Sequence, residues 1–212
     1  MGNYLFSTKI LIDALNEGHR LGDKDFGSHV IPRLCKTHRV LAYDFSTNRI
    51  PGVRDYEEQG YWRDVGTIDA YFQAHQDLLG LEPRFNLFNP HWCIGSKGYQ
   101  GPSAKFIHTE IDNSIVSAGS FIKGARIHNS IIRREVLIEE DVELDECIVM
   151  DYTVIRRGAR LKRAIIDRYN VIKAGRHIGY NRDADAKSYF MSDSGIVIVP
   201  KLPHDGGPPR YL

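Results

Sequence analysis

The sequence is poor in cysteine and has no excess of charge of either sign. Its three cysteines, Cys35, Cys93 and Cys147, are far apart and form no CxxC pair, so they predict neither a disulfide framework nor a zinc site. The 28 basic and 27 acidic side chains leave a formal net charge of +1. Because so small a charge gives no overall attraction to a polyanion, we expect neither nucleic acid nor a membrane surface as a partner.

Long apolar runs and several common motifs are also missing. No stretch of about 18 apolar residues and no opening signal peptide occurs, which predicts a soluble, reducing, cytoplasmic setting. The nine histidines show neither HxH nor HxxxH spacing, so a metal centre built on histidine is not expected. No GxGxxG motif or P-loop is present, so the sequence contains no glycine-rich loop that could cradle a phosphate.

A repeat of 16 or 17 residues fills much of the second half of the chain. Four segments align, beginning at Asn113, Asn129, Glu146 and Arg163. Each has an aliphatic residue at its third place, another seven residues later and a third five or six residues after that. The three columns are Ile115, Ile131, Ile148 and Ile165; Ile122, Ile138, Ile155 and Ile172; and Ile127, Leu144, Leu161 and Ile178. Three inward aliphatic residues in about 17 predict a triangular coil, so residues 113–178 should form a parallel β-helix.

An ordinary run of short antiparallel strands is the alternative interpretation of this repeat. A fixed period with aliphatic residues in register over four copies favours the β-helix, and no helical period of 3.6 residues fits the segment. The period does not fix the hand of the coil, although crossovers between parallel strands are usually right-handed.

The third and fourth coils carry many basic residues on their expected outer surface. These are Arg156, Arg157, Arg160, Lys162, Arg163, Arg168, Lys173 and Arg176. One interpretation is a solvated face balanced by nearby acidic residues, which are Glu139, Glu140, Asp141, Glu143, Asp145 and Glu146. The other is an anion site for a phosphorylated ligand, since arginine forks match the geometry of a phosphate.

The first hundred residues do not repeat and predict a mixture of strands and helices. The run MGNYLF at the start and the alternating RVLAYDF at residues 39–45 favour strands. One helix is expected between Ser7 and Gly18, and a second between Thr67 and Gly80, with the first residue of each pair as N-cap and the glycine as C-cap.

These elements are too few for a self-contained α/β domain. The first residue already falls inside a strand pattern, so we interpret residues 1–100 as the C-terminal portion of a larger α/β domain whose front lies elsewhere. The glycine- and proline-rich residues 95–102 are expected to link this portion to the β-helix.

Several motifs occur in the same order in a known enzyme family. They are MGNYLF, DFGSHVIP at residues 25–32, YWRDVGTIDAYFQAHQDLL at residues 61–79, FNLFNPHWCI at residues 85–94, AIIDR at residues 164–168 and SGIVIVPK at residues 194–201. On these motifs the chain resembles the C-terminal half of bacterial ADP-glucose pyrophosphorylase, also called glucose-1-phosphate adenylyltransferase. WRDVGT alone occurs in neighbouring sugar nucleotidyltransferases, whereas the whole series is specific to this family.

The resemblance implies a mixed fold and a reaction. Residues 1–100 would be an incomplete α/β nucleotidyltransferase piece, and residues 101–212 a left-handed parallel β-helix of the hexapeptide type with a C-terminal tail. The family reaction converts ATP and glucose 1-phosphate into ADP-glucose and pyrophosphate for glycogen or starch synthesis, with Mg²⁺ as cofactor. Most family members are homotetramers, so we expect a homo-oligomer, either a dimer or a tetramer.

The resemblance also implies roles for individual residues. Asp64 would be a catalytic magnesium ligand, and a carboxylate suits that hard cation. Tyr4, Asp25, Phe26 and Trp62 match positions that line the glucose 1-phosphate side of the pocket. The alternatives are structural, with Asp64 at the entry of a helix, Tyr4 and Trp62 as core residues and Asp25 as a turn residue.

Two further residues match basic family positions that bind phosphorylated allosteric effectors. These are Arg168 and Lys201, near the end of the last repeat and after the closing strand pattern SGIVIV. The alternative for each is an ion pair with a local carboxylate such as Asp167 or Asp205. The sequence does not indicate which effector would bind.

The ATP side of the family pocket has no counterpart in this sequence. The resemblance places the nucleotide loop, a second magnesium aspartate, a phosphate-binding lysine and a glucose-binding glutamate in an N-terminal half. We therefore expect ATP to bind only through that half and the chain to be inactive alone.

Two other functions compete with this interpretation. A non-catalytic regulatory or oligomerisation subunit built on the same solenoid is the main alternative, although a pure scaffold has no need of the metal carboxylate Asp64. A hexapeptide-type acyltransferase would need a histidine base, and His128 and His177 are the only histidines of the repeat.

Overall fold

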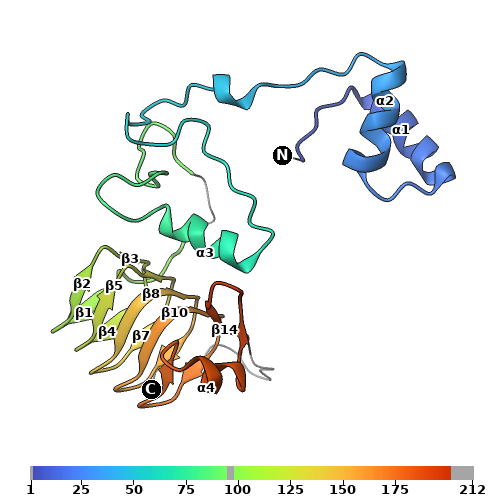
Figure 1. The fold of residues 1–212 in the computed structure, drawn as a ribbon. Helices are drawn as coiled ribbons and strands as arrows, with labels where there is room; N and C mark the ends of the chain where they lie inside the picture. Colours follow the sequence, from blue (N-terminus) through green and yellow to red (C-terminus); the bar gives the residue numbers. More distant parts are fainter. Residues whose placement is uncertain (1, 95–97, 202–212) are drawn as a thin grey trace. The chain divides into compact units, whose positions relative to one another are not determined.

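The computed structural model describes residues 2–94 and 98–201, which Figure 1 shows as a ribbon. The chain divides into two compact units, Met1–Arg49 and Ile50–Leu212. Among the described residues, no helix has the length and apolar character needed to cross a lipid bilayer.

The first unit is helical. α1 (Thr8–Leu21) is followed by a π-helix, η1 (Phe26–Val30), which continues directly into α2 (Ile31–Thr37), and a 3-10 helix, η2 (Phe45–Thr47), comes next. A small core holds these helices together. It consists of Ala14, Val30 and Leu34, with Phe6, Ile10 and Phe26 packed against them.

The two strands expected in the first unit are absent. Residues 2–7 and 38–44 have no regular secondary structure, and no described strand pairs with them. The strand prediction for these runs is wrong because an alternating pattern forms a strand only when a neighbouring strand accepts its backbone hydrogen bonds. The sequence pattern also gives no sign of α2, whose seven residues are too few to show a helical period.

α1 begins after Ser7 as predicted, but it ends at Gly22 instead of Gly18. Gly22 has a left-handed φ of 74° and donates its N–H toward the carbonyl oxygens of Gly18 and His19. Gly18 is buried inside the helix, where a Cβ would lie 3.1 Å from a carboxylate oxygen of Asp23. Gly18 therefore makes room for Asp23, which pairs with Arg33 at 2.6 Å.

α3 (Ile68–Gln76) belongs to the second unit and begins where the sequence predicts. Thr67 is its N-cap, because the Thr67 hydroxyl accepts a hydrogen bond from the N–H of Ala70 at 3.2 Å. The helix ends before Gly80 because the N–H groups of Leu78 and Leu79 bond to carbonyls three residues back, which tightens the last turn.

Residues from Lys105 onward wind into a parallel β-helix, which confirms the predicted solenoid and adds a coil before Asn113. One sheet contains, in order, β1 (Lys105–Ile107), β4 (Phe121–Lys123), β7 (Leu137–Ile138), β9 (Val154–Ile155) and β11 (Val171–Ile172). The other contains β2 (Glu110–Asp112), β5 (Arg126–His128), β8 (Glu143–Val149) and β10 (Arg160–Ile166), together with β3 (Ile115–Val116), β6 (Ile131–Ile132) and β12 (His177–Ile178). Every pair of neighbouring coils is in parallel register, as in Ile122 with Ile138 and Ile138 with Ile155.

Three short elements follow the last coil. α4 (Arg182–Ala186) comes first, and β13 (Phe190–Met191) then pairs antiparallel with β14 (Val197–Val199). β14 pairs in parallel with β10, so this segment extends the sheet beyond the repeat.

The corners of the coils require a left-handed backbone. All nine described non-glycine residues with a positive φ lie between residues 108 and 169, in the β-helix. Glu135, Tyr152 and Tyr169 occupy one such corner in successive coils, at the place that Gly119 holds before them. A left-handed residue with a side chain costs about 1–2 kcal/mol, which contacts between coils must offset. The Tyr152 and Tyr169 rings supply one such contact, stacked 5.2 Å apart with 2° between their planes.

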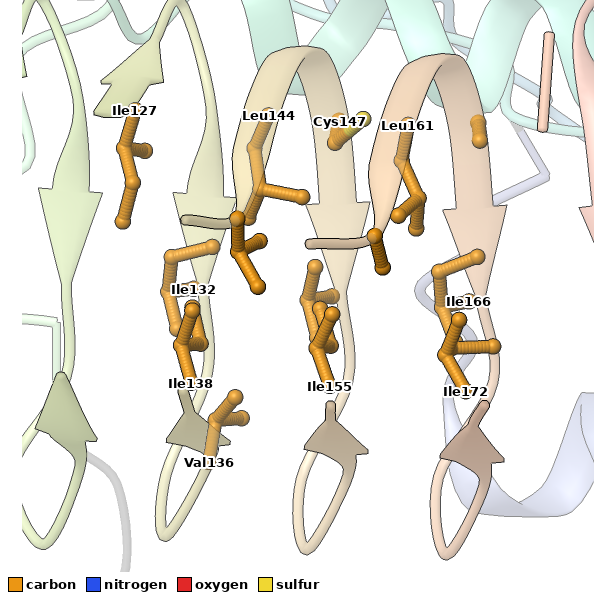
Figure 2. Close-up of a cluster of buried hydrophobic side chains, with 14 of the residues drawn as sticks. Ile127, Ile132, Val136, Ile138, Leu144, Cys147, Ile155, Leu161, Ile166 and Ile172 are labelled. Atoms are coloured by element: carbon orange, nitrogen blue, oxygen red, sulfur yellow. The ribbon is translucent and has the colours of Figure 1, made fainter. Parts of the chain in front are cut away.

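Two of the three predicted aliphatic columns point into the coil, as Figure 2 shows for Ile138, Ile155 and Ile172 and for Ile127, Leu144 and Leu161. The third prediction needs correction. The inward residues of that face are Ile132, Val149 and Ile166, one position after the predicted column. Because side chains alternate along a strand, Ile148 and Ile165 point outward instead.

α3 covers this outward column. Phe72 of the helix forms a second buried cluster with Ile148, Ile165 and Ile196. Gln76 Nε2 donates to the carbonyl of Asn129 at 3.4 Å, and further along the chain the N–H of Gly80 donates to Asn113 Oδ1 at 2.6 Å. The helix therefore runs along the β-helix from the later coils toward the first one.

Candidate functional site

Three of the predicted sugar-binding residues lie together in the first unit. Tyr4 stacks on Phe26 with ring centroids 6.1 Å apart, and Phe6 contacts both rings. A Cβ on Gly27 would lie 3.2 Å from the Tyr4 hydroxyl and 3.4 Å from Asp25 Oδ1. The hydroxyl and the carboxylate therefore converge beside Gly27. Tyr4 is 43% exposed, so it presents this hydroxyl at the surface instead of filling a core.

Ser28 fixes the orientation of Asp25. Asp25 Oδ1 accepts hydrogen bonds from the Ser28 hydroxyl at 2.7 Å and from the Ser28 N–H at 2.6 Å, which caps η1. These bonds lower the pKa of Asp25 below its ordinary value, so the carboxylate is ionised at neutral pH. Asp25 is thus the N-cap of η1. Both hydrogen bonds from Ser28 go to Oδ1, which leaves Oδ2 to accept from a ligand hydroxyl.

Trp62 and Asp64 lie in the loop that leads into α3. Asp64 Oδ1 accepts a hydrogen bond from the N–H of Gly66 at 3.1 Å, so the carboxylate shapes the turn before the N-cap Thr67. Trp62 is 44% exposed, and Asp64 is also exposed. Neither residue is part of a core, and the described hydrogen bond to Asp64 uses only one of its two carboxylate oxygens.

An ion-pair network around the buried carboxylate of Asp77 holds this loop, and sequence reasoning missed it. Arg63 donates from Nε to Asp77 Oδ2 at 2.7 Å, and from its two terminal nitrogens to Glu58 at 2.8 and 2.6 Å. The Asp77 side chain is only 2% exposed and also accepts from the Tyr61 hydroxyl at 3.3 Å. Because Arg63 is anchored between Trp62 and Asp64, its network sets where both neighbours point. The only sequence signal of this network was the arginine of the WRD motif. Its partner Asp77 lies 14 residues further along the chain, so the pairing could not be recognised from the sequence.

The four predicted sugar-side residues and the predicted magnesium ligand Asp64 belong to two different units. Tyr4, Asp25 and Phe26 form one group in the first unit, and Trp62 and Asp64 form another in the second unit. Each group is preorganised by its own contacts, Ser28 in the first and Arg63 in the second.

A magnesium ion would find a single protein ligand at Asp64. In the part of the chain that the structure describes, no three His, Cys, Asp or Glu side chains gather closely enough to hold a metal. Magnesium commonly keeps several waters and takes one or two carboxylates together with substrate phosphates. An exposed carboxylate with one open oxygen fits that chemistry as a partial ligand set.

The two predicted effector residues lie on either side of Asp167. The N–H of Arg168 donates to Asp167 Oδ1 at 2.7 Å, with the guanidinium Nε 3.8 Å from the same oxygen. The N–H of Lys201 donates to Asp167 Oδ2 at 3.3 Å, and its Nζ lies 4.9 Å above the Tyr169 ring. The local ion pair expected as an alternative for Arg168 is therefore present, and both residues meet at one carboxylate. Asp205 lies outside the described residues.

Most of the basic residues of the third coil are paired with acids one coil earlier. Each partner lies 17 residues before the basic residue. The pairs are Arg156 with Glu139, Arg157 with Glu140, Arg160 with Glu143, Lys162 with Asp145 and Arg163 with Glu146. These residues form a ladder of ion pairs, which supports the interpretation of a balanced, solvated face over that of an anion site.

Two protein-family models match the chain. A nucleotidyl transferase model matches residues 1–80, and a model described as GlmU-like, C-terminal hexapeptide, matches residues 102–199. The first match covers both groups of predicted sugar-side residues, and the second covers the β-helix.

Curated relatives match over nearly the whole chain. The glucose-1-phosphate adenylyltransferase of Thermodesulfovibrio yellowstonii is 46% identical over 202 residues, which are 95% of this chain and 49% of the relative. Those of Frankia casuarinae and Photobacterium profundum are 41% and 39% identical, over 95% of this chain and 51% of each relative. The chain thus spans about half the length of the curated relatives it matches.

Proposed function

Because the chain is a homologue of the glucose-1-phosphate adenylyltransferases over about half of their length, we propose that it supplies the glucose 1-phosphate side of such an enzyme. The reaction would join ATP and glucose 1-phosphate into ADP-glucose and pyrophosphate. The observation that supports this most directly is the convergence of the Tyr4 hydroxyl and the Asp25 carboxylate beside the Phe26 ring, in the part that matches the nucleotidyl transferase model.

Each residue of the sugar side would do a task that suits its chemistry. Phe26 in the first unit and Trp62 in the second each offer an apolar surface to a sugar, and the ionised Asp25 can accept hydrogen bonds from sugar hydroxyl groups. The sugar would thereby be held so that its phosphate can attack the α-phosphorus of ATP in line. Bound Mg²⁺ would neutralise charge between the phosphates, with Asp64 as one of its ligands.

The chain alone should not complete the reaction. The sequence has no glycine-rich loop that could hold the triphosphate, so ATP would bind through the half of the relatives that this chain does not match.

We propose a cytoplasmic setting and, at Arg168 and Lys201, a site for a phosphorylated effector. The Arg168 guanidinium lies 3.8 Å from Asp167 Oδ1, whereas Lys201 bonds to this carboxylate only through its backbone N–H and holds its ammonium 4.9 Å from the Tyr169 ring, where it can attract an anion.

We also propose that the chain forms a homo-oligomer, a dimer or a tetramer. The first coil supports this proposal. Lys105 and Ile107 bond to the next coil, so the alternate residue Phe106 directs its N–H and C=O away from it, and Ile111 does the same in β2. Such open edges favour pairing with another chain.

The experiment is complementation. The purified chain is mixed with the N-terminal half of the Thermodesulfovibrio yellowstonii relative, and pyrophosphate release is measured with ATP, glucose 1-phosphate and Mg²⁺. We expect background release from each part alone and turnover from the mixture. Turnover of the chain alone in the usual enzyme range of about 1–1,000 per second would contradict the proposal.

The second candidate is a non-catalytic regulatory or oligomerisation subunit. The observation that favours it is the absence of a phosphate-cradling motif from the sequence. It would be supported if the two halves associate and fold but the mixture remains at background.

A further inference from the structure

A largely apolar groove of about 760 Å³ opens at the surface of the first unit. Residues 3–7, before α1, and residues 38–41, after α2, line it together. The helices complete the lining with Ile10 of α1 and with Ile31 and Leu34 of α2. The two irregular segments that the sequence pattern predicts to be strands therefore border one common groove.

The backbone of both segments lacks the pairing that a strand needs. Among the described residues, no backbone N–H or C=O group of residues 3–6 or of residues 39–43 bonds to the backbone of another segment. Residues 2–7 and 38–44 are long enough to pair, since an ordinary strand has about five or six residues. Each segment therefore presents a row of donors and acceptors to which a further strand can bond.

The same segments carry apolar side chains on both faces. Leu5 lies between two aromatic residues, and Leu41 lies between Val40 and Ala42. Leu5 is 103% exposed and Leu41 is 77% exposed, so the chain itself covers neither side chain. Strands that are apolar on both faces are typical of a sheet with helices on both sides. In the part of the chain that the structure describes, the first unit has the helices for such a sheet but no strand.

We propose that the groove receives a β-strand from the other half of the enzyme, which is the part of the relatives that this chain does not match. The strand inserts between residues 2–7 and 38–44, bonds to both and makes them members of one sheet. The nucleotidyl transferase model matches residues 1–80, which contain the groove, and about half of each relative lies outside the match. The inference rests on the proposed function, because its occupant is the half through which ATP would bind.

Two other occupants fit the groove less well. A small apolar molecule would cover the side chains but would leave the backbone groups of both segments without strand partners. A second copy of this chain would offer only the same two segments. Each groove would then have to receive a segment that already borders a groove of its own.

Hydrogen exchange of the assembled halves tests the inserted strand. The full chain is co-expressed with the N-terminal half of the Thermodesulfovibrio yellowstonii relative, and the complex is isolated through a tag on that half. Amides of residues 3–6 and 39–43 should exchange near their intrinsic rates in the chain alone and at least tenfold more slowly in the complex. Amides of β7 and β9 should not change, because these coils are already paired with each other.

The outcomes separate this inference from the proposed reaction. Slower exchange in both segments without pyrophosphate release would support the inserted strand and contradict the reaction. Pyrophosphate release without slower exchange in both segments would do the reverse. Failure of the halves to associate would overturn both. Protection in the chain alone that grows with its concentration would mean that a second copy fills the groove, which would also overturn the inference.

Charged variants test whether the apolar faces are covered in the complex. Leu5→Asp and Leu41→Asp should leave the chain alone folded, because both side chains are exposed there. Each should weaken association of the halves at least tenfold, because the inserted strand and its cover would bury the new carboxylate. Leu81→Asp is the matched control, since Leu81 is 98% exposed but does not line the groove. Unchanged association of both groove variants, or an equal loss in the control, would contradict the proposed docking surface.

Discussion

The hydroxyl of Ser192 donates a hydrogen bond to Asp69 Oδ1 over 2.9 Å, although the two residues are 123 positions apart in the chain. The Ser194 hydroxyl donates to the same oxygen. Asp69 belongs to the first turn of α3, and the serines belong to the segment around β13 and β14. This contact ties the helix that follows the Asp64 loop to the end of the β-helix.

The Asp69 contact should make the docking of α3 sensitive to acid. Hydrogen bonds from Ser194 and Ser192 lower the pKa of Asp69 below its ordinary value. A lowered pKa in the folded state gives stability that is present above about pH 4 and lost as the pH falls further. The protection factors of the α3 amides, which compare each rate with intrinsic exchange at the same pH, should therefore fall below about pH 4 in the wild type. Asp69→Asn should show faster exchange already at pH 7 and a flatter pH profile. Asp193 lies between Ser192 and Ser194, and the control variant Asp193→Asn should behave like the wild type.

Two glycines with similar backbone angles should respond differently to alanine. Gly158 has φ +69° with open space around a Cβ, so Gly158→Ala should cost only the left-handed penalty of about 1–2 kcal/mol. Gly179 has φ +86°, and a Cβ there would overlap the backbone carbonyl oxygen of Lys162. Gly179→Ala should cost about 1–3 kcal/mol more, because the backbone must shift. Denaturant unfolding of the two variants measures the difference, and equal costs would contradict the close approach.

The inward column of isoleucines should dominate the stability of the β-helix. Ile138 is fully buried between Ile122 and Ile155, so Ile138→Ala should destabilise the fold by about 2–5 kcal/mol. Val171 lies in β11 but is 47% exposed, and Val171→Ala is the matched control. It should cost less than about 1 kcal/mol in the same denaturant titration.

Asp64 should matter for turnover and little for folding. In the complemented enzyme, Asp64→Asn should lower the turnover number by orders of magnitude, because the amide keeps the shape but removes the charge that suits magnesium. The thermal midpoint of the chain should change little, since Asn can also accept the Gly66 N–H. Asp55→Asn, at another exposed acid of the same unit, should keep normal turnover. A fully active Asp64→Asn would mean that Asp64 serves only the turn.

The open edge of the first coil should contribute to assembly. We expect a dimer or tetramer by light scattering at micromolar concentration. Phe106→Pro removes the outward N–H of β1 without removing a bond to β4, and Phe106 is 48% exposed, so the variant should weaken association while the β-helix stays folded. A monodisperse wild-type monomer would count against the assembly proposal. An unchanged oligomer of Phe106→Pro would place the interface elsewhere.

The β-helix could be predicted from the sequence because its signal is repeated and local. The columns that begin at Ile122 and Ile127 each lie on one face of successive coils, and the structure confirms that the side chains of both columns point inward. The column led by Ile115 was assigned to the wrong side. Two adjacent aliphatic residues, such as Ile131 and Ile132, mark each coil, and a period cannot tell which of the two is covered by a helix from another part of the chain.

The structure of residues 2–94 was harder to predict, because it depends on partners that are distant in the sequence. MGNYLF and RVLAYDF alternate like strands, but no described strand lies beside them, so the local pattern gives the wrong element. The Arg63 network was hidden for the same reason, since Asp77 lies 14 residues away and is buried only after folding. The roles of Tyr4, Asp25, Phe26, Trp62, Asp64, Arg168 and Lys201 remain predictions, although the structure shows how local contacts orient several of them.

The 17-residue spacing of the ion-pair ladder has a consequence for how such a chain can change its length. Loss or gain of a single residue inside a strand would break pairings such as that of Ile138 with Ile155 and rotate the next isoleucine out of the interior. Loss or gain of a whole coil would preserve every column, corner and acid–base pair. Coils contact mainly their immediate neighbours, so stability would change by about one repeat's contribution at a time. Larger natural variation in this segment should therefore come in whole-coil steps, whereas the corners can absorb one residue, as the coils of 16 and 17 residues show.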